Sequence, residues 1–544
     1  MVEQRQRPPR GRTPSLGRAS GAMAVATMVS RLSGLFAKML LVWVLGLGMI
    51  NDSYTVANTL PTVVNELLLG GVLTSVAVPL LVSARQNSEE EGESYAQWMI
   101  TMGVVLLLAA TVLAVLAAPL LTELYLGPHT RANRELTTAF AYLLLPGIVF
   151  YGLSALLMAI LNVRQVFGPP AWAPVMNNVV IIATVAVYSV LPGEISADPV
   201  RMGQAKLLVL GVGTMLGIAA QSSVMVLSLR RTGFRFRWRW GWDRRLAEFG
   251  ALAGWVVLYT VVSQLGMIVA IRVAGQGTSG SVATFHYAWL LSQVPYGVLG
   301  VSLLQALMPR ISRSVAQGDT ESFVRDVGLG SRLSAVLLMP VSALMLTAGS
   351  AIGVAFFSLG QGSVGAADRL GVTLGVASAG IVPFAITMLQ LRAFYAMKDA
   401  RTPMLINVIM VVFRTAVCYT LLVWLDPRQL VVGVALSMSL SFFVGAVVGQ
   451  CWLHHRLGRM QTRRTLVGLG WSLLASSIGC ACAFAAWYTL RERLGGFGEV
   501  ATAWMSLGVH GTLVLGLGFG VMLLLPIPEM GMIRQRLRGL LSRF

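Results

Sequence analysis

The sequence predicts an all-α polytopic membrane protein with about 14 transmembrane helices. Of its 544 residues, 56% are hydrophobic and 12% are charged, whereas soluble domains carry about 25% charged residues. The mean hydropathy is +0.73. Apolar stretches of about 20 residues, the length that crosses a bilayer, recur along the whole chain. This composition excludes a soluble enzyme, a disordered chain and a secreted disulfide scaffold.

Fourteen stretches have the length and composition of a spanning helix. They begin near Gly21, Ser53, Tyr95, Leu136, Ala171, Lys206, Leu246, Ser281, Phe323, Leu370, Met404, Val431, Leu466 and Ala503. Prolines lie in the middle of several of them, namely Pro61, Pro79, Pro146, Pro295, Pro340 and Pro383. We expect bent helices there, because neighbouring helices and water can satisfy the backbone groups that a proline frees.

The basic residues predict the orientation of these spans. Net charge is +19, from 41 Lys and Arg against 22 Asp and Glu. If the N-terminus is cytoplasmic, alternate loops and tails place 27 basic residues inside and 8 outside. Cytoplasmic loops carry the excess of Lys and Arg in membrane proteins. We therefore expect a multi-pass membrane protein with both termini in the cytoplasm.

The longest basic loop, Arg230–Arg245, alternates arginine with phenylalanine and tryptophan in the sequence RRTGFRFRWRWGWDRR. Cations interleaved with aromatic rings can bind nucleic acid. Between two spans, however, such a segment more simply lies on an anionic lipid surface. We favour membrane lipids as its partner and expect no nucleic-acid partner.

An internal repeat organises the chain. AILNVRQVFGPP (159–170) matches AFYAMKDARTPM (393–404) at an offset of 234, and NELLLGGVLTSVAVPLL (65–81) matches PYGVLGVSLLQALMPRI (295–311) at 230. Chance similarity of apolar strings is the alternative explanation. The offset equals six spans, an even number, so the copies have the same orientation and a pseudo-twofold axis along the membrane normal.

The repeat predicts two six-helix lobes, with a cavity between them, and two additional C-terminal helices. The expected units are a basic cytoplasmic tail (1–18), an N-lobe (19–230, helices 1–6), an amphipathic basic loop (231–245), a C-lobe (246–457, helices 7–12), helices 13 and 14 (458–527) and a second basic cytoplasmic tail (528–544).

Polar side chains within the spans indicate where the cavity lies, because ionisable groups in hydrocarbon are costly and usually face a cavity or a partner. Three pairs stand seven residues apart and so share a helix face: Arg31 with Lys38, Asn58 with Asn65, and His286 with Gln293. The full set of candidate substrate-binding residues is Arg31, Lys38, Asp52, Asn58, Asn65, Glu66, Arg272, His286, Gln293, Arg392 and Arg414.

Alternatives remain open for several of these residues. Arg31 and Lys38 could form structural ion pairs with Asp52 or Glu66, and charges near helix ends, such as Arg272 and Arg392, could extend toward water. His286 could be a buried core histidine. The charge of these helices is net cationic, which suits an anionic substrate. The sequence lacks a P-loop, an H-E-x-x-H motif and paired catalytic carboxylates, so we expect no enzyme, no cofactor and no metal site.

Three segments carry a resemblance to a known family: FYAMKDARTPM (394–404), LPTVVNELLLGGVLTSVAVPLL (60–81) and YGVLGVSLLQALMPRIS (296–312). With them the chain resembles the MurJ/MviN lipid II flippases, within the multidrug/oligosaccharidyl-lipid/polysaccharide exporter superfamily. The resemblance covers essentially the whole chain. It implies movement of lipid II, a disaccharide pentapeptide linked by pyrophosphate to undecaprenol or decaprenol, to the outer leaflet of the bacterial plasma membrane in cell-wall synthesis. The parallel repeats and bent helices predict that this movement occurs by alternating access.

The resemblance also implies roles for particular positions. Ser30–Arg31 and Asp52 match family residues, whereas the family's second helix 1 arginine and aspartate fall on Ala37 and Lys38. Its helix 2 lysine and arginine fall on Thr59 and Asn65. Helices 13 and 14 line a groove for the polyprenyl tail in that family, and some relatives have sodium ligands where this chain has Arg414 and Cys418.

Two other functions are weighed against the flippase. One is a cation-coupled drug or polysaccharide-lipid exporter of the same superfamily, which would favour acidic residues in its cavity. The other is a membrane scaffold whose basic tails recruit cell-wall synthesis or regulatory proteins, in which the cavity charges would be inert.

Overall fold

The structure is a computed structural model that describes residues 16–70, 78–196, 200–201, 203–241, 250–458, 460–492, 497–526 and 528–531. Its regular elements are all helices. Eleven described helices are long and apolar enough to cross a membrane, and the number rises to 13 if two bent pairs each count as one span. The remaining expected span, beginning near Ser53, includes residues 71–77, which lie outside the described part.

The helices of the first half come in the order of the chain. They are α1 (Leu16–Leu45), α2 (Met49–Asn65), the π-helix η1 (Glu66–Gly70), α3 (Val78–Asn87), α4 (Glu89–Leu116), α5 (Ala118–Leu126), α6 (Arg134–Leu144), α7 (Gly147–Val163), α8 (Gly168–Val190) and α9 (Ala205–Arg231).

The second half repeats this order. Its elements are α11 (Gly250–Gly275), α12 (Ser281–Pro295), the π-helix η3 (Tyr296–Gly300), α13 (Val301–Ala316), α14 (Thr320–Thr347), α15 (Gly349–Phe357), α16 (Val364–Ser378), α17 (Ile381–Ala396), α18 (Arg401–Trp424) and α19 (Leu430–Leu457). The C-terminal elements follow as α20 (Thr462–Arg491), α21 (Glu499–His510), η5 (Gly511–Leu515), α22 (Gly516–Leu524) and η6 (Pro528–Met530).

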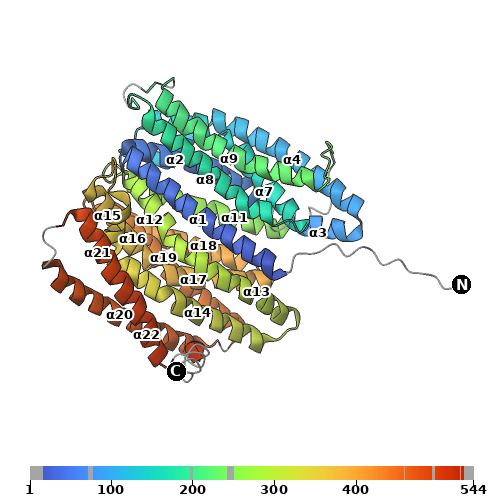
Figure 1. Cartoon of the computed structure of the whole chain (residues 1–544). Helices are drawn as coiled ribbons and strands as arrows, with labels where there is room; N and C mark the ends of the chain where they lie inside the picture. The colour runs from blue at the N-terminus through green and yellow to red at the C-terminus, as the bar shows by residue number, and fades with distance from the viewer. Residues whose placement is uncertain are drawn as a thin grey trace.

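The internal repeat extends to fine detail. The π-helices η1 and η3 lie 230 residues apart, the offset of the sequence match that contains them. Equivalent helices also make equivalent contacts: α1 packs on α8 as α11 packs on α18, and α2 packs on α6 as α12 packs on α16. Figure 1 shows the first half in blue to green beside the second half in light green to orange. Chance similarity of apolar strings does not explain this correspondence.

Two spans are bent as the prolines predict. Helices α6 and α7 meet at 46° across Leu145 and Pro146, and α16 and α17 meet at 46° across Ala379 and Gly380. Pro383, in the first turn of α17, has no N–H to continue the ladder of the preceding helix. Pro61 and Pro295 instead precede the π-helices η1 and η3.

The FYAMKDARTPM segment (394–404) spans the turn between α17 and α18. Asp399 accepts hydrogen bonds from the Thr402 backbone N–H (3.0 Å) and from the Thr402 hydroxyl (2.7 Å), and it also pairs with Arg456 of α19. Burial acts to raise the pKa of Asp399, but these hydrogen bonds outweigh it and hold the pKa below the ordinary value. The motif therefore fixes the beginning of α18 and ties it to α19.

The C-terminal helices attach to the second half. Helices α20 and α22 pack on α14, and α21 packs on α15 (Figure 1, red). A buried ion pair closes this contact: Arg332 of α14 donates to Glu529 of η6, whose side chain is 2% exposed, and also to Gln461 (3.2 Å).

Replacing Glu529 with glutamine is expected to lower the thermal unfolding temperature by several degrees. Removing one partner of a buried ion pair leaves a buried charge without compensation, at a cost of about 3–5 kcal/mol. Thermal unfolding of the purified protein in detergent measures the change. Glu321→Gln, at an exposed position near the beginning of α14, is the control and should unfold like the unsubstituted protein. Equal unfolding temperatures for the two variants would show that the ion pair does not hold the C-terminal helices.

Candidate functional site

A cavity of about 630 Å³ lies between the two halves. Its walls come from α1, α2, η1, α7, α8 and α9 of the first half and α11 and α12 of the second. It brings together six of the predicted residues: Arg31, Lys38, Asn58, Glu66, His286 and Gln293. We call this space the central cavity.

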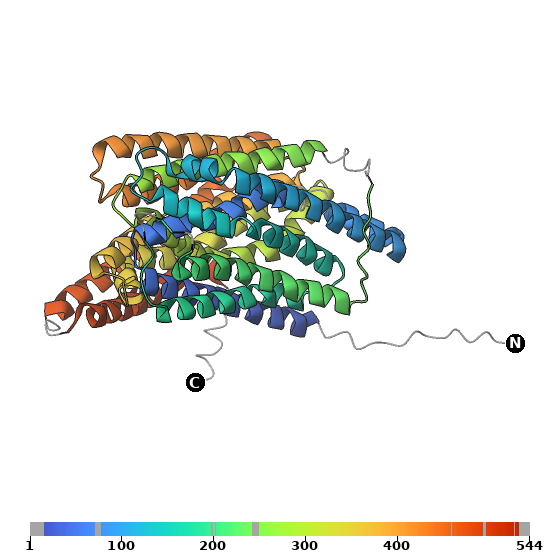
Figure 2. The same ribbon diagram turned by 90° about the horizontal axis from the view of Figure 1, so that it is seen from above.

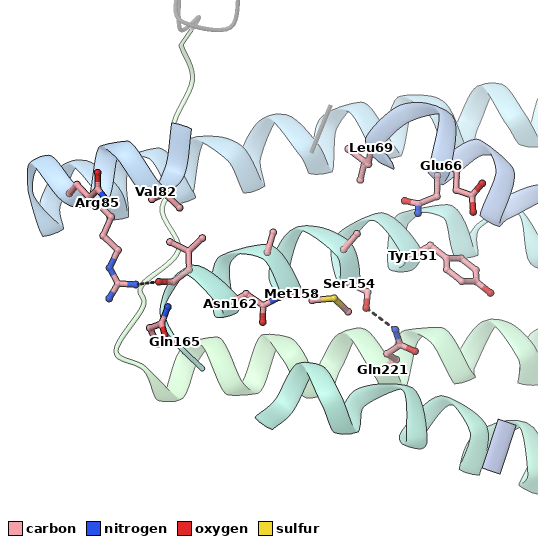
Figure 3. Close-up of a pocket in the computed structure, with 15 residues that line it drawn as sticks. Glu66, Leu69, Val82, Arg85, Tyr151, Ser154, Met158, Asn162, Gln165 and Gln221 are labelled. Carbon is pink, nitrogen blue, oxygen red and sulfur yellow. Dashed lines mark hydrogen bonds between the residues drawn. The ribbon is translucent and has the colours of Figure 1, made fainter. Parts of the chain in front are cut away.

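A second chamber of about 920 Å³ adjoins the central cavity, and both are lined by Glu66 and Tyr151. Figure 3 shows its length, from Glu66 and Tyr151 at one end to Arg85 and Gln165 at the other. Amide side chains dominate its polar lining: Asn65, Gln86, Asn162, Gln165 and Gln221. Amides both donate and accept hydrogen bonds, so this chamber suits neutral polar groups. We call it the amide chamber.

The amide chamber reaches one end of the helix bundle. Arg85 donates to the Val163 carbonyl (2.6 Å) at its mouth, and Gln221 donates to Ser154 (3.0 Å) further in. Arg85 and Gln86 are both exposed. The end of the bundle that holds the turns at 87–88, 164–167 and 397–400 is therefore called the open end.

The two cations of the central cavity have no acidic partner among the described residues. No described carboxylate lies within 4.0 Å of Arg31 or Lys38. Asp52 and Glu66, the expected partners, bond elsewhere: Glu66 accepts from the Gln264 amide of α11 (2.7 Å). The alternative of structural ion pairs is therefore wrong for these residues, and both cations are available to an anionic ligand.

Arg31 lies directly against the backbone of η3. A Cβ added at Gly297 would be 2.2 Å from Arg31 Nη1, so only glycine leaves room for the guanidinium in this position. The side chain of Arg31 is exposed and lines the central cavity. The π-helix of the second half thus helps to position the principal cation of the first.

Asp52 has a different place from the one that sequence reasoning gave it. It is 2% exposed and is not among the residues that line the cavity. Its carboxylate crosses to the second half, where it accepts from the backbone N–H groups of Gly280 (2.7 Å) and Ala283 (2.8 Å). At the beginning of α12 these N–H groups have no acceptor within the helix itself. A carboxylate that accepts from them therefore stabilises the helix.

Other hydrogen bonds join the two halves at the same end of the bundle as Asp52. Tyr287 donates to Asn51 (2.9 Å), and the Gln361 backbone N–H donates to the Trp43 carbonyl (2.7 Å). Trp43 Nε1 in turn donates to the Phe356 carbonyl (2.7 Å). With Asp52, these contacts close the cavity away from the amide chamber. We call this end, with the turns at 46–48, 276–280 and 358–363, the closed end.

Gly280→Ala is expected to loosen the closed end. Gly280 has φ of +84°, and an added Cβ would lie 2.0 Å from the Leu47 carbonyl oxygen of the other half. The left-handed backbone alone costs a non-glycine residue about 1–2 kcal/mol, and Leu47 would also have to move. Hydrogen–deuterium exchange at the beginning of α12 should therefore become faster.

Gly48→Ala is the matched control for this substitution. Gly48 lies in the facing turn, and nothing lies within 4 Å of an added Cβ. Exchange in Gly48→Ala should match the unsubstituted protein. If Gly280→Ala also left the exchange rate unchanged, the contact with Leu47 would not hold the ends together.

The remaining predicted residues lie outside the central cavity. Asn65 lines the amide chamber. Arg272 Nε donates to the Leu124 carbonyl (2.7 Å) and so joins α11 to α5. Arg392 is exposed on α17. Arg414 is buried between α18 and α11, where a Cβ added at Gly266 would meet its guanidinium.

Sequence reasoning missed several residues of the site. Asn177 and Asn178 line the central cavity from α8, and Asn178 donates to the Ser30 carbonyl (2.9 Å), next to Arg31. Two adjacent asparagines in an apolar span were a usable signal. The glycine-rich turn GQGTSG before α12 marked Gly280 in the same way. The described residues contain no group of three His, Cys, Asp or Glu suited to a metal ion.

Comparisons with known proteins agree with this architecture. Residues 41–507 match the family described as lipid II flippase MurJ. A probable lipid II flippase MurJ of Rhizobium tropici is 26% identical over 528 residues, covering 94% of this chain and 95% of the relative. The lipid II flippase MurJ of Burkholderia cenocepacia is 24% identical over 405 residues, covering 72% and 76%.

Two solved structures show the same fold. One is a lipid II flippase MurJ in an inward closed conformation, with a TM-score of 0.71 and 19% identity, covering 91% of this chain and 97% of that one. The other is an inward-facing MATE family transporter of the MOP superfamily, with a TM-score of 0.63 and 15% identity, covering 80% and 98%. Because the family match spans most of the sequence, the chain belongs to the lipid II flippase MurJ family.

Proposed function

We propose that this multi-pass membrane protein moves lipid II from the cytoplasmic to the outer leaflet of the bacterial plasma membrane. The observation that carries the proposal is the pair of cations, Arg31 and Lys38, which have no acidic partner in the described part of the chain and line a cavity that is closed at one end. Moving the charged pyrophosphate through hydrocarbon without compensation would cost many kcal/mol. Fixed cations in a polar cavity lower that barrier.

The central cavity and the amide chamber would bind different parts of the lipid II headgroup. Arg31 and Lys38 face the pyrophosphate, and the amide chamber, with its neutral hydrogen-bonding side chains, takes the sugars and peptide. Cavities for drug-sized ligands measure about 300–1,000 Å³, so two adjoining spaces of about 630 and 920 Å³ suit a larger headgroup. The polyprenyl tail would stay in lipid beside α20, whose Leu466, Leu473 and Phe484 are exposed.

The transport cycle we propose is alternating access. The N-lobe (19–230) and the C-lobe (246–457) would rock about the cavity, with the present arrangement as the state in which the open end faces the cytoplasm. Hydrogen bonds through Asp52, Asn51 and Trp43 hold the closed end shut. The closed end can open only if these hydrogen bonds break, and the open end must then close.

The cavity argues against the other two functions. A cation-coupled exporter would favour acidic residues in its cavity, but Glu66 is the one carboxylate among the described residues that line the central cavity, beside the two cations Arg31 and Lys38. A scaffold would need no unpaired cations in its interior, where each costs about 2.5–3.5 kcal/mol on insertion scales.

The proposed orientation predicts which cysteines are reachable from outside the cell. In a background without native cysteines, Arg428→Cys at the closed end should react with an impermeant thiol reagent in intact cells. Gln317→Cys, in the turn after α13 at the open end, should react only after the cells are lysed. Both positions are exposed, so accessibility alone does not separate them. Labelling of Gln317→Cys in intact cells would reverse the orientation.

Complementation tests the function itself. Expression of the chain in a bacterium depleted of its own lipid II flippase should restore growth. Membrane levels checked by blotting distinguish lack of activity from lack of protein. Failure to restore growth at normal membrane levels would contradict the proposal.

A further inference from the structure

An extended segment, residues 234–241, links α9 to the second half across the outside of α4 (Figure 2, green). Three hydrogen bonds hold it there. Gln97 of α4 donates to the Arg235 carbonyl (2.8 Å), Trp98 donates to the Gly241 carbonyl (2.7 Å), and the Arg239 N–H donates to Thr101 (3.2 Å). We call this segment the strap.

The strap has two chemically different sets of side chains. In extended backbone, successive side chains point to opposite faces. The strap aromatics (Phe236, Trp238, Trp240) occupy even positions and are 42%, 59% and 69% exposed. The strap arginines (Arg235, Arg237, Arg239) occupy odd positions and are exposed as well. They form no ion pair within the described part of the chain.

The beginning of the strap is fixed beside the amide chamber. Phe234 is 5% exposed, and the Arg164 guanidinium lies over its ring at 5.0 Å. Arg164 also donates to Thr232 (3.2 Å), in the turn that follows α9. The strap therefore starts from a position held by Arg164, the sequence neighbour of Gln165 at the mouth of the chamber.

The position of the strap along α4 coincides with a change in composition. Residues 89–97 of α4 read EEEGESYAQ, and the apolar run of this helix begins at Trp98. The strap contacts Gln97, Trp98 and Thr101, so it lies where the helix changes from polar to apolar, the level at which we expect α4 to enter the bilayer. Tryptophan is enriched at this level in membrane proteins, because its ring is amphipathic.

We propose that the strap is a binding surface for anionic phospholipid in the leaflet at the open end. Its aromatic rings enter the boundary between headgroups and acyl chains, and its arginines pair with lipid phosphates. Charge complementarity identifies the occupant, because three guanidinium groups without an ion pair among the described residues would face a surface that carries negative charge. This surface is separate from the central cavity, and the inference does not depend on what the cavity transports.

Titration of the purified full chain with phosphatidylglycerol and with phosphatidylcholine, followed by native mass spectrometry, tests the proposal. Replacing the three strap arginines with glutamine should raise the Kd for phosphatidylglycerol at least about tenfold, since each basic residue near an anionic surface contributes about fivefold. The Kd for phosphatidylcholine should not change. Arg313, Arg463 and Arg464, also exposed near the open end, supply a charge-matched control when replaced by glutamine.

Each outcome of the titration is decisive. Equal Kd values for phosphatidylglycerol in the strap-arginine variant and the control variant would overturn the proposal. An equal loss of affinity for both lipids in the strap-arginine variant would also overturn it. Replacing the three strap aromatics with serine should weaken the binding of both lipids equally and keep the preference for phosphatidylglycerol. Unchanged binding would contradict insertion of the aromatic rings into the lipid. Tighter binding of a single-stranded oligonucleotide that phosphatidylglycerol cannot displace would assign the strap to nucleic acid instead.

Discussion

Arg31→Ala is expected to abolish lipid II flipping while the protein still reaches the membrane. Arg31 lines the central cavity, has no described acidic partner and lies against Gly297 of the opposite half. Hydrogen bonds to charged groups contribute about 1.5–3 kcal/mol each, so losing a guanidinium that grips two phosphate oxygens should slow transport by well over tenfold. Failure to restore growth to a flippase-depleted strain, at normal membrane levels, is the measurement.

The variant Arg31→Lys distinguishes the effect of the positive charge from that of the planar guanidinium. Lysine keeps the charge but loses the planar fork that binds phosphate oxygens in pairs, so this variant should retain partial activity. Lys38→Ala should be milder than Arg31→Ala. Arg313→Ala removes an exposed arginine far from the cavity and should grow normally. Normal growth of Arg31→Ala at normal levels would reduce Arg31 to a structural residue and overturn the cationic cavity.

Asp52→Ala is expected to open the closed end in the absence of substrate. Its carboxylate accepts from the Gly280 and Ala283 N–H groups across the boundary between the halves. Loss of a helix cap and of an acceptor for buried N–H groups costs about 2–4 kcal/mol. That energy is lost only from the state with a closed outer end, so the population shifts toward the opposite state.

The shift can be measured from outside the cell. Ile271 lines the central cavity and is 6% exposed, so Ile271→Cys should react slowly with an impermeant thiol reagent in intact cells. Adding Asp52→Ala should make the reaction at least about tenfold faster, because 1.4 kcal/mol corresponds to tenfold in an equilibrium. Asp52→Asn keeps one acceptor oxygen and should lie between. Asp426→Ala, at an exposed position of the same end, should have no effect.

The fold was largely predictable, because hydrophobicity alone sets where a chain crosses the bilayer. The repeat was visible in two short matches, and η1 and η3 lie at the predicted offset. The short helices α5 and α15 were not predicted, because each follows a span without a polar break. Residues 1–15, 242–245 and 532–544, which hold much of the expected basic tails and loop, lie outside the described part.

The site was only partly predictable. Helical spacing of seven identified Arg31 with Lys38 and His286 with Gln293, and all four line the central cavity. Spacing cannot show the partner of a polar group, since that depends on helices distant in sequence. Asp52 therefore looked like a cavity residue, whereas it caps α12 from 228 residues away. The amide chamber escaped notice because its uncharged side chains are scattered over α2, α3, α7, α9 and the turn after α7.

Flipping of lipid II by the purified protein in proteoliposomes tests the central claim most directly. Lipid II exposed on the leaflet opposite to the open end is quantified over time with an impermeant enzyme or label. The unsubstituted protein should accelerate the appearance of lipid II over empty vesicles, and Arg31→Ala, reconstituted at the same density, should not. No acceleration by the unsubstituted protein, or equal acceleration by Arg31→Ala, would contradict transport through a cationic cavity.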